Sequence, residues 1–325
     1  MTQTAQTPLV VSNLTKRFGN ITAVESLSFE VAPNRVTGFL GPNGAGKTTT
    51  LRCILGLVNP SAGDARIDGK SYSELPNPTA VVGAALEATG FHPGRNARDT
   101  LRIRSTVLYG SRDDKRITEL LNYVGLGDAI TRKVGGYSLG MRQRLNLAMA
   151  LIGEPRMLIL DEPGNGLDPA GIAWLRSFMR GFATDGRSVL VSSHLLSEVK
   201  QSVDDVVILD RGRLVAADSL AALLDHSGGG TVSVLGPELD RLQVVIAEQH
   251  PAATCQVEAN TPSTQGGASA NARLVVTGLS AADVGHLAYT NNVELHGLTA
   301  QDPAEDLERL FLRLTGNGSA QEDSQ

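Results

Sequence analysis

The stretch Gly41-Pro42-Asn43-Gly44-Ala45-Gly46-Lys47-Thr48, continued by Thr49, decides the fold of this chain. It matches the pattern of a glycine, four residues and then Gly-Lys-Thr that is typical of phosphate-binding loops. The glycines let the backbone curl so that successive N–H groups point inward at an anion. We expect Lys47 to reach the β- and γ-phosphates of a nucleotide and the Thr48 hydroxyl to bind Mg²⁺.

The residues around this loop have the periodicity that the pattern requires. Val36–Leu40 is typical of a short buried strand, and residues 48–57 show helical spacing of apolar residues. The positive N-terminal end of that helix would add to the attraction for phosphate. The sequence therefore predicts a strand, a phosphate-binding loop and a helix in direct succession.

Composition narrows the class of protein. The 325 residues include 41% hydrophobic and 19% charged residues, as in ordinary globular proteins. The net charge of −5 argues against broad electrostatic binding of nucleic acid. Cys53 and Cys255 lie far apart and have no metal-ligand spacing, which favours a reducing compartment. No apolar run approaches the roughly 18 residues that would cross a bilayer, and the polar N-terminus does not resemble a signal peptide. We therefore expect a cytoplasmic chain.

Before the loop, residues 9–14 and 27–31 alternate well enough for two antiparallel strands, after a disordered lead-in at residues 1–8. The turn predicted at residues 15–20 carries Phe18, which is either a platform for a nucleotide base or a core residue at the strand end. After the loop, residues 65–69 and 81–86 are predicted strands.

Residues 88–135 are predicted to form an inserted helical subdomain, with helices around 98–109 and 113–126. Four arginines near its start are either a basic patch for a partner or a solvated helical face: Arg95, Arg98, Arg102 and Arg104.

Three polar sites follow the helical subdomain. Ser138 is a predicted N-cap, and Gly140 would let a ligand approach the backbone. The apolar strand 157–160 ends in Asp161 and Glu162, where α/β sheets bind ligands, so that one carboxylate can hold a metal while the other orients water. The strand 188–192 delivers His194 to the same edge, which indicates a catalytic role.

A glycine-rich segment at residues 227–230 marks a predicted domain boundary, so the first domain spans 9–226 and a second spans 231–315. The second has the order βαββαβ, typical of a ferredoxin-like α+β domain, with a polar hairpin tip at 259–271. An amphipathic helix over 303–314 would close it, and the tail 316–325 is predicted to be disordered. This half shows no catalytic constellation.

Together these motifs resemble the ATP-binding cassette (ABC) ATPases over about residues 9–225. The phosphate loop corresponds to Walker A, residues 157–162 to Walker B, and Tyr137-Ser-Leu-Gly-Met-Arg-Gln to the signature. Asn165-Gly-Leu-Asp168 resembles the D-loop, His194 the switch histidine and Phe18 the adenine-stacking aromatic. The implied fold is an α/β P-loop NTPase with a mixed sheet, an antiparallel β-subdomain and a helical subdomain.

Two departures from the family pattern resemble the subfamily that exports drugs and peptide antibiotics. Glu87 stands at the usual glutamine of the Q-loop, and Leu139 and Met141 replace a glycine and a glutamine of the signature. The C-terminal extension is also similar to that subfamily. Glu87 could ligate Mg²⁺ directly or through water.

The resemblance implies a head-to-tail dimer around two ATP molecules. Each ATP would lie between one phosphate loop and Ser138 and Gly140 of the other cassette, with Asp168 nearby. Glu162 would polarise the attacking water, His194 would contact the γ-phosphate, and Thr48 and Asp161 would hold Mg²⁺. The second cassette would be a second copy of the chain or a homologue.

We therefore expect the ATP-hydrolysing subunit of an ABC exporter, peripheral on the cytoplasmic face of the membrane. A separate permease would bind and move the substrate, a drug, antibiotic or lipid-like compound, and the helical insert with Phe91 would be the docking face. The alternative is a soluble ABC ATPase acting on ribosomes or nucleic acid. The single cassette and the lack of coiled-coil or zinc modules argue against this alternative. The second domain would be a dimer contact or a regulatory ligand sensor.

Overall fold

The structure is a computed structural model that describes residues 9–86, 90–184, 186–194, 201–226, 232–258 and 273–300. The chain divides into two compact units, Met1–Ser219 and Leu220–Gln325. The second unit begins with the helix α8 (Leu220–His226), which precedes the glycine-rich boundary predicted from the sequence.

A six-stranded sheet organises the first unit. Its order is β5-β6-β7-β3-β8-β9, parallel except for the antiparallel hairpin of β8 and β9. The strands are β3 (Val36–Leu40), β5 (Val82–Ala85), β6 (Met157–Asp161), β7 (Ser188–Ser193), β8 (Asp205–Asp210) and β9 (Arg213–Ser219). Every residue of β3, β6 and β7 is buried, as expected for parallel strands covered on both faces.

The register of this sheet brings the predicted site together. Ser192 of β7 lies opposite Asp161 on β6 and opposite Phe39 on β3. Because these strands are parallel, the segments that follow them leave from one edge of the sheet. The phosphate loop leads from β3 into α1 (Lys47–Ile54), which packs Leu51 and Ile54 into the core.

A second sheet of the first unit has the antiparallel order β2-β1-β4, with β1 (Leu9–Phe18), β2 (Ile21–Val31) and β4 (Ala62–Ile67). The predicted turn at residues 15–20 is wrong: β1 continues to Phe18 and only two residues, Gly19 and Asn20, turn the chain. Register shifts between Val11 and Arg17 interrupt the alternation of buried and exposed residues, and this hides the second half of the strand in the sequence.

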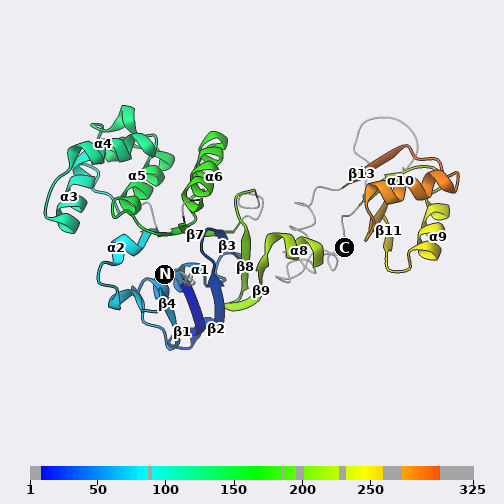
Figure 1. The fold of residues 1–325 in the computed structure, drawn as a ribbon, viewed down its shortest axis with the longest axis horizontal. Helices are drawn as coiled ribbons and strands as arrows, with labels where there is room; N and C mark the ends of the chain where they lie inside the picture. Colours follow the sequence, from blue (N-terminus) through cyan, green and yellow to red (C-terminus); the bar gives the residue numbers. More distant parts are fainter. Residues whose placement is uncertain are drawn as a thin grey trace, which may run out of the picture. The chain divides into compact units, whose positions relative to one another are not determined.

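Besides α1, the described helices of the first unit include α2 (Pro78–Val81), α3 (Ala97–Tyr109), α4 (Asp114–Tyr123), α5 (Leu139–Leu151) and α6 (Pro169–Ala183). Figure 1 shows α3 to α6 on one side of the six-stranded sheet and the antiparallel strands on the other. Side-chain oxygens of Asn96, Asp113, Ser138 and Asp168 cap the last four, which confirms Ser138 as an N-cap. Of the four arginines near the start of the helical subdomain, Arg102 pairs with Asp99 and Asp114 and so joins α3 to α4.

The second unit contains β10 (Val232–Leu235), α9 (Leu239–Gln249), β11 (Thr254–Glu258), β12 (Arg273–Thr277), α10 (Ala281–Thr290) and β13 (Gly297–Ala300). The predicted order βαββαβ is therefore confirmed. The sheet order is β11-β12-β10-β13, antiparallel throughout, and its core includes Val234, Leu242, Leu274 and Leu287. The ferredoxin-like classification stays a prediction that this topology supports. The predicted features at 1–8, 259–271, 303–314 and 316–325 lie outside the described residues.

The packing of α1 can be tested through Cys53, whose side chain is 6% exposed and whose thiol pKa is raised by burial. In a Cys255→Ser variant of the full chain, we expect iodoacetamide to label Cys53 at least about 100-fold more slowly at pH 7 than in denaturant. In the folded chain the reagent cannot reach the buried thiol, and the raised pKa lowers the fraction of reactive thiolate. Mass spectrometry over a time course measures both rates. Equal rates would contradict the packing of α1 in the core.

Candidate active site

The phosphate loop curls around its cavity because three of its glycines occupy positions where another residue would clash or have a strained backbone. A Cβ atom on Gly41 would lie 2.5 Å from the Leu209 carbonyl oxygen, and one on Gly46 would lie 2.5 Å from the Ala23 carbonyl oxygen. Gly44 and Gly46 also have φ values of 82° and 98°, in the left-handed region. The resulting cavity of about 280 Å³ is lined by Asn43, Gly44, Ala45, Gly46, Lys47, Thr48, Thr49, Glu162, Asn165 and His194. Backbone N–H groups, a lysine and a helix N-terminus fit a chain of phosphates.

Lys47 supplies the positive charge of this cavity. Its side chain is 6% exposed, and Nζ donates hydrogen bonds to the Gly41 and Pro42 carbonyl oxygens at 2.6 and 3.3 Å. Nζ also lies 3.3 Å from Glu162 Oε1. A buried ammonium group needs such partners because desolvation alone would destabilise its charged form.

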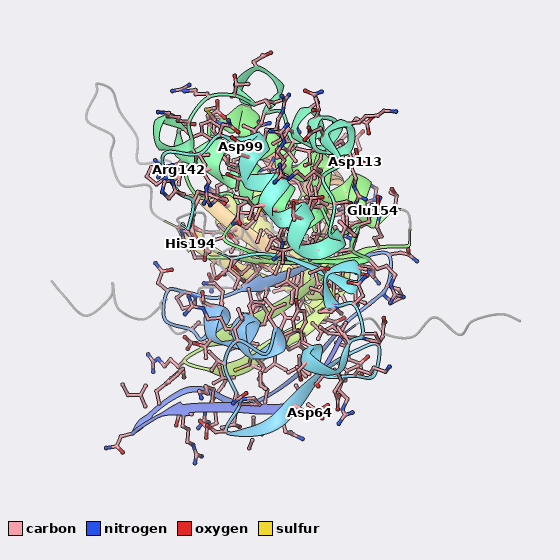
Figure 2. All side chains as sticks on the ribbon, turned by 90° about the vertical axis from the view of Figure 1, so that its left-hand side faces the viewer. Asp64, Asp99, Asp113, Arg142, Glu154 and His194 are labelled. Atoms are coloured by element: carbon pink, nitrogen blue, oxygen red, sulfur yellow. The ribbon has the colours of Figure 1, made fainter. Side chains whose placement is uncertain are left out.

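The carboxylate of Glu162 lies between the side chains of Lys47 and His194. Its Oε1 faces Lys47, while Oε2 lies 2.6 Å from Nδ1 of His194. The residue has φ 50°, a left-handed conformation that glutamate rarely adopts, and such backbone strain is concentrated at functional sites. In Figure 2 His194 lies near the level of the sheet, between Asp64 of β4 and Asp99 of the helical part. The structure thus brings the two predicted catalytic residues into direct contact.

Thr48 and Asp161, two of the three predicted metal ligands, lie in direct contact. Thr48 Oγ1 donates to Asp161 Oδ2 at 2.8 Å, so a hydroxyl and a carboxylate oxygen converge beside the cavity. Mg²⁺ commonly takes one or two carboxylates together with substrate phosphates and waters, which this pair fits. Among the described residues no cluster of three or more His, Cys, Asp or Glu could hold a metal. Glu87, the third predicted ligand, lies outside the described residues.

Ser192 is a site residue that sequence reasoning missed. Its hydroxyl donates to Asp161 Oδ1 and accepts from the Glu162 backbone N–H at 2.9 Å, so one side chain orients both acidic residues. The available signal was a serine within a strand predicted to be buried, since buried hydroxyls require partners. Asn165, which lines the cavity, was recognised only as the first residue of the segment that resembles the D-loop.

The remaining predicted residues lie elsewhere. Phe18 is 50% exposed, so it is not a core residue, and Lys16 Nζ lies 4.8 Å from its ring centroid. Ser138 caps α5 through Met141 N, and Asp168 caps α6 through Gly171 N. These three residues and Gly140 are not among those that line the cavity. Their roles toward adenine or a second cassette stay predictions.

Replacing Lys47 by alanine should lower ATP affinity by about 100-fold, because a charge-assisted contact with phosphate is lost from a buried site. Equilibrium binding of a fluorescent ATP analogue to the full chain measures this. Lys115→Ala removes the same charge from an 88% exposed side chain and should leave the affinity unchanged. Equal affinities in the two variants would refute the role of Lys47.

Replacing Ser192 by alanine should lower kcat by about tenfold while ATP affinity changes by less than about threefold, since two hydrogen bonds that orient Asp161 and Glu162 disappear. Steady-state kinetics over a range of ATP concentrations separates kcat from KM. Ser177→Ala is the control, because it removes a serine hydroxyl on α6 that donates to the Ala173 carbonyl oxygen and contacts neither acidic residue. An unchanged kcat would show that the Ser192 contacts do not matter for hydrolysis.

Comparisons with known proteins agree with this geometry. A family model described as "ABC transporter" matches residues 24–165, and one described as a domain of unknown function matches residues 230–308. The chain is 43% identical over 212 residues to an uncharacterized ABC transporter ATP-binding protein of Bacillus subtilis, covering 65% of this chain and 69% of that protein. It is 40% identical over 213 residues to the bacitracin transport ATP-binding protein of Bacillus licheniformis, covering 64% and 69%.

Two further matches extend the comparison. The Nod factor export ATP-binding protein I of Ralstonia nicotianae is 33% identical over 315 residues, 95% of this chain and 94% of that protein. A solved structure of an ATP-binding subunit of an ABC transporter has a TM-score of 0.61 and 28% identity, covering 68% of this chain and 93% of that one. With its phosphate loop, adjacent carboxylates and strand-end histidine assembled on this fold, the chain belongs to the ATP-binding subunits of ABC transporters.

Proposed function

We propose that this chain hydrolyses ATP to drive an exporter whose membrane permease is a separate polypeptide. The observation that carries the proposal is the Glu162 carboxylate, held between Lys47 and His194 at the phosphate-loop cavity. Relatives named for transport of bacitracin and lantibiotics and for export of Nod factors support export of a drug, antibiotic or lipid-like compound. These names do not favour the alternative of an ATPase that acts on ribosomes or nucleic acid.

The contacts of Glu162 suggest how ATP prepares the site for hydrolysis. In the structure, Lys47 and His194 both face its carboxylate. Phosphate oxygens of ATP compete for the Lys47 ammonium and the His194 ring, which frees Glu162 to accept a hydrogen bond from water. The loop N–H groups and Lys47 then stabilise the charge on the transferred phosphoryl group. Catalysis in this scheme is positioning and charge neutralisation.

Thr48 and Asp161 are the described residues that would hold Mg²⁺, and we propose Glu87 as a third ligand. When bound there, the ion would neutralise negative charge on the phosphates. Ser192 keeps the Asp161 carboxylate directed at Thr48, because its hydroxyl holds the other carboxylate oxygen.

A second cassette would complete the site. Ser138 is exposed at the N-terminus of the 13-residue helix α5, where backbone N–H groups and the helix dipole favour an anion. Since Ser138 and Gly140 do not line the cavity of their own chain, we propose that they face the γ-phosphate of ATP on the partner cassette. That partner would be a second copy of this chain or a homologue.

The helical part offers a face for the permease. Val107 on α3 is 74% exposed and Ile103 is also exposed, beside a hollow of about 310 Å³ lined in part by Phe91, Arg104 and Met149. Apolar side chains exposed around a hollow are typical of interaction sites. In the described parts of the chain, no helix has the length and apolar character to cross a membrane. We propose that this face docks on the permease at the cytoplasmic surface of the membrane.

Replacing Glu162 by glutamine tests the proposal. The amide keeps the shape of the side chain but cannot polarise water, so we expect hydrolysis to fall by at least about 100-fold while ATP binding persists. Tagged Glu162→Gln protein, purified with ATP from mild-detergent extracts of its own cells, should retain a stoichiometric polytopic membrane protein.

The control is the same purification with Lys47→Ala, which should not form the ATP-bound state. Hydrolysis at the wild-type rate by Glu162→Gln would remove Glu162 from the mechanism. Ribosomes or nucleic-acid proteins without a membrane partner would refute the exporter proposal.

A further inference from the structure

The start of α5 packs directly on the loop that follows Glu162. A Cβ atom on Gly166 would lie 2.1 Å from Leu139 Cδ2, and one on Gly140 would lie 3.1 Å from Leu167 Cδ2. Leu139, which departs from the glycine of the family pattern, therefore fills the space that Gly166 leaves open. This contact alone involves only one end of α5, so it cannot fix the direction of the helix.

Arg144 makes a second contact, further along α5. Its guanidinium carbon lies 4.2 Å from the ring centroid of Trp174 on α6, within cation–π range. Its Nη1 donates to the Val124 carbonyl oxygen at the end of α4, at 3.0 Å. Arg144 thus joins three helices of the first unit: α4, α5 and α6.

The surroundings of Arg144 are shaped to hold it. Gly125 has φ 74°, and a Cβ atom there would lie 2.3 Å from Arg144 Nη1, so a larger residue would close the path to Val124. Trp174 stacks on Phe178 at 5.6 Å between ring centroids, and Tyr123 meets Phe178 edge-on at 5.9 Å. Trp174 itself is half-buried, and the Arg144 guanidinium lies over its ring.

We propose that Arg144 is a positioning residue that aligns α5, and with it Ser138 and Gly140, to α6 and the loop after Glu162. This inference rests on the proposed function, in which Ser138 and Gly140 bind ATP on the partner cassette. The phosphate-loop cavity of the same chain does not include Arg144. Loss of Arg144 should therefore impair closure of two cassettes and leave the first binding of ATP intact.

The geometry requires arginine in particular. A guanidinium is planar, so it can stack on the indole while one of its N–H groups reaches a carbonyl oxygen outside the stack. The compact ammonium group of lysine cannot make both contacts in this way. Arg144→Lys keeps the charge and removes the planar contact, which separates the two properties.

The test uses the full-length chain with Arg144→Lys and Arg144→Met. We expect kcat to fall by about tenfold in both, with ATP affinity of the dilute monomer within about twofold of wild type. In the Glu162→Gln background, Arg144→Met should raise by about tenfold or more the protein concentration at which half of the chains are dimeric in the presence of ATP. Analytical ultracentrifugation measures this concentration.

Arg116→Met is the matched control. Arg116 also donates to a backbone carbonyl oxygen of the helical part, that of Ile152 at 2.7 Å, but its described contacts include no residue of α6. Its kcat should stay within about twofold of wild type. A double-mutant cycle with Trp174→Leu completes the test, because residues in contact should show non-additive losses of kcat.

Three results would overturn the inference: wild-type kcat in Arg144→Lys, equal loss of ATP affinity and of kcat in Arg144→Met, or additive effects of Arg144 and Trp174. Thermal unfolding of each variant shows whether a loss of kcat comes from a loss of folded protein, and a matching loss would also count against positioning. If Glu162→Gln itself fails to dimerise with ATP, the proposed pairing of two copies of this chain around ATP fails. If it dimerises and Arg144→Met dimerises equally well, only the role of Arg144 fails.

Discussion

The buried charge of Lys47 is the constraint on which the rest of the site depends. An ammonium group that is 6% exposed is stable only with partners, and here these are the Gly41 and Pro42 carbonyl oxygens and the Glu162 carboxylate. Three features of the fold place these partners around Lys47. The glycines let the loop curl, the end of β6 positions Glu162, and the pairing of β6, β7 and β3 brings the loop and this strand end together. Phosphate oxygens carry the same negative charge as the carboxylate, so the group that stabilises Lys47 here is one that a nucleotide can replace.

The two acidic residues at the end of β6 are separated in role by their hydrogen bonds. Asp161 is held by hydroxyls on both carboxylate oxygens, from Thr48 and Ser192, which suits a fixed ligand. Glu162 has a strained backbone conformation, and the described partners of its carboxylate are Lys47 and His194, which phosphate can also bind. This suits a carboxylate that must become free. Their neighbours in space, not their chemistry, distinguish the two.

The helical part is joined to the sheet by contacts that also reach the site. Leu139 fills the space over Gly166, and Arg144 contacts Trp174, so the start of α5 and the segment between Glu162 and α6 form one packed interface. The second unit has a hydrophobic core built from its own strands and helices. The match to the Nod factor export protein covers 95% of this chain, so the similarity to this relative extends into the second unit.

The sequence by itself determined what depends on neighbours along the chain: the phosphate loop, the N-cap at Ser138, the buried strands and the βαββαβ order of the second unit. Each of these follows from local spacing and from the backbone preferences of a few residues. The sequence pattern did not decide whether Phe18 is buried or exposed, because the bulges of β1 interrupt the alternation of buried and exposed residues. Only the tertiary structure decided the partners of Ser192, the pairing of Glu162 with His194 and the contact of Arg144 with Trp174. Those contacts join residues about 30 positions apart, and strand register and helix packing, which no local pattern encodes, bring them together.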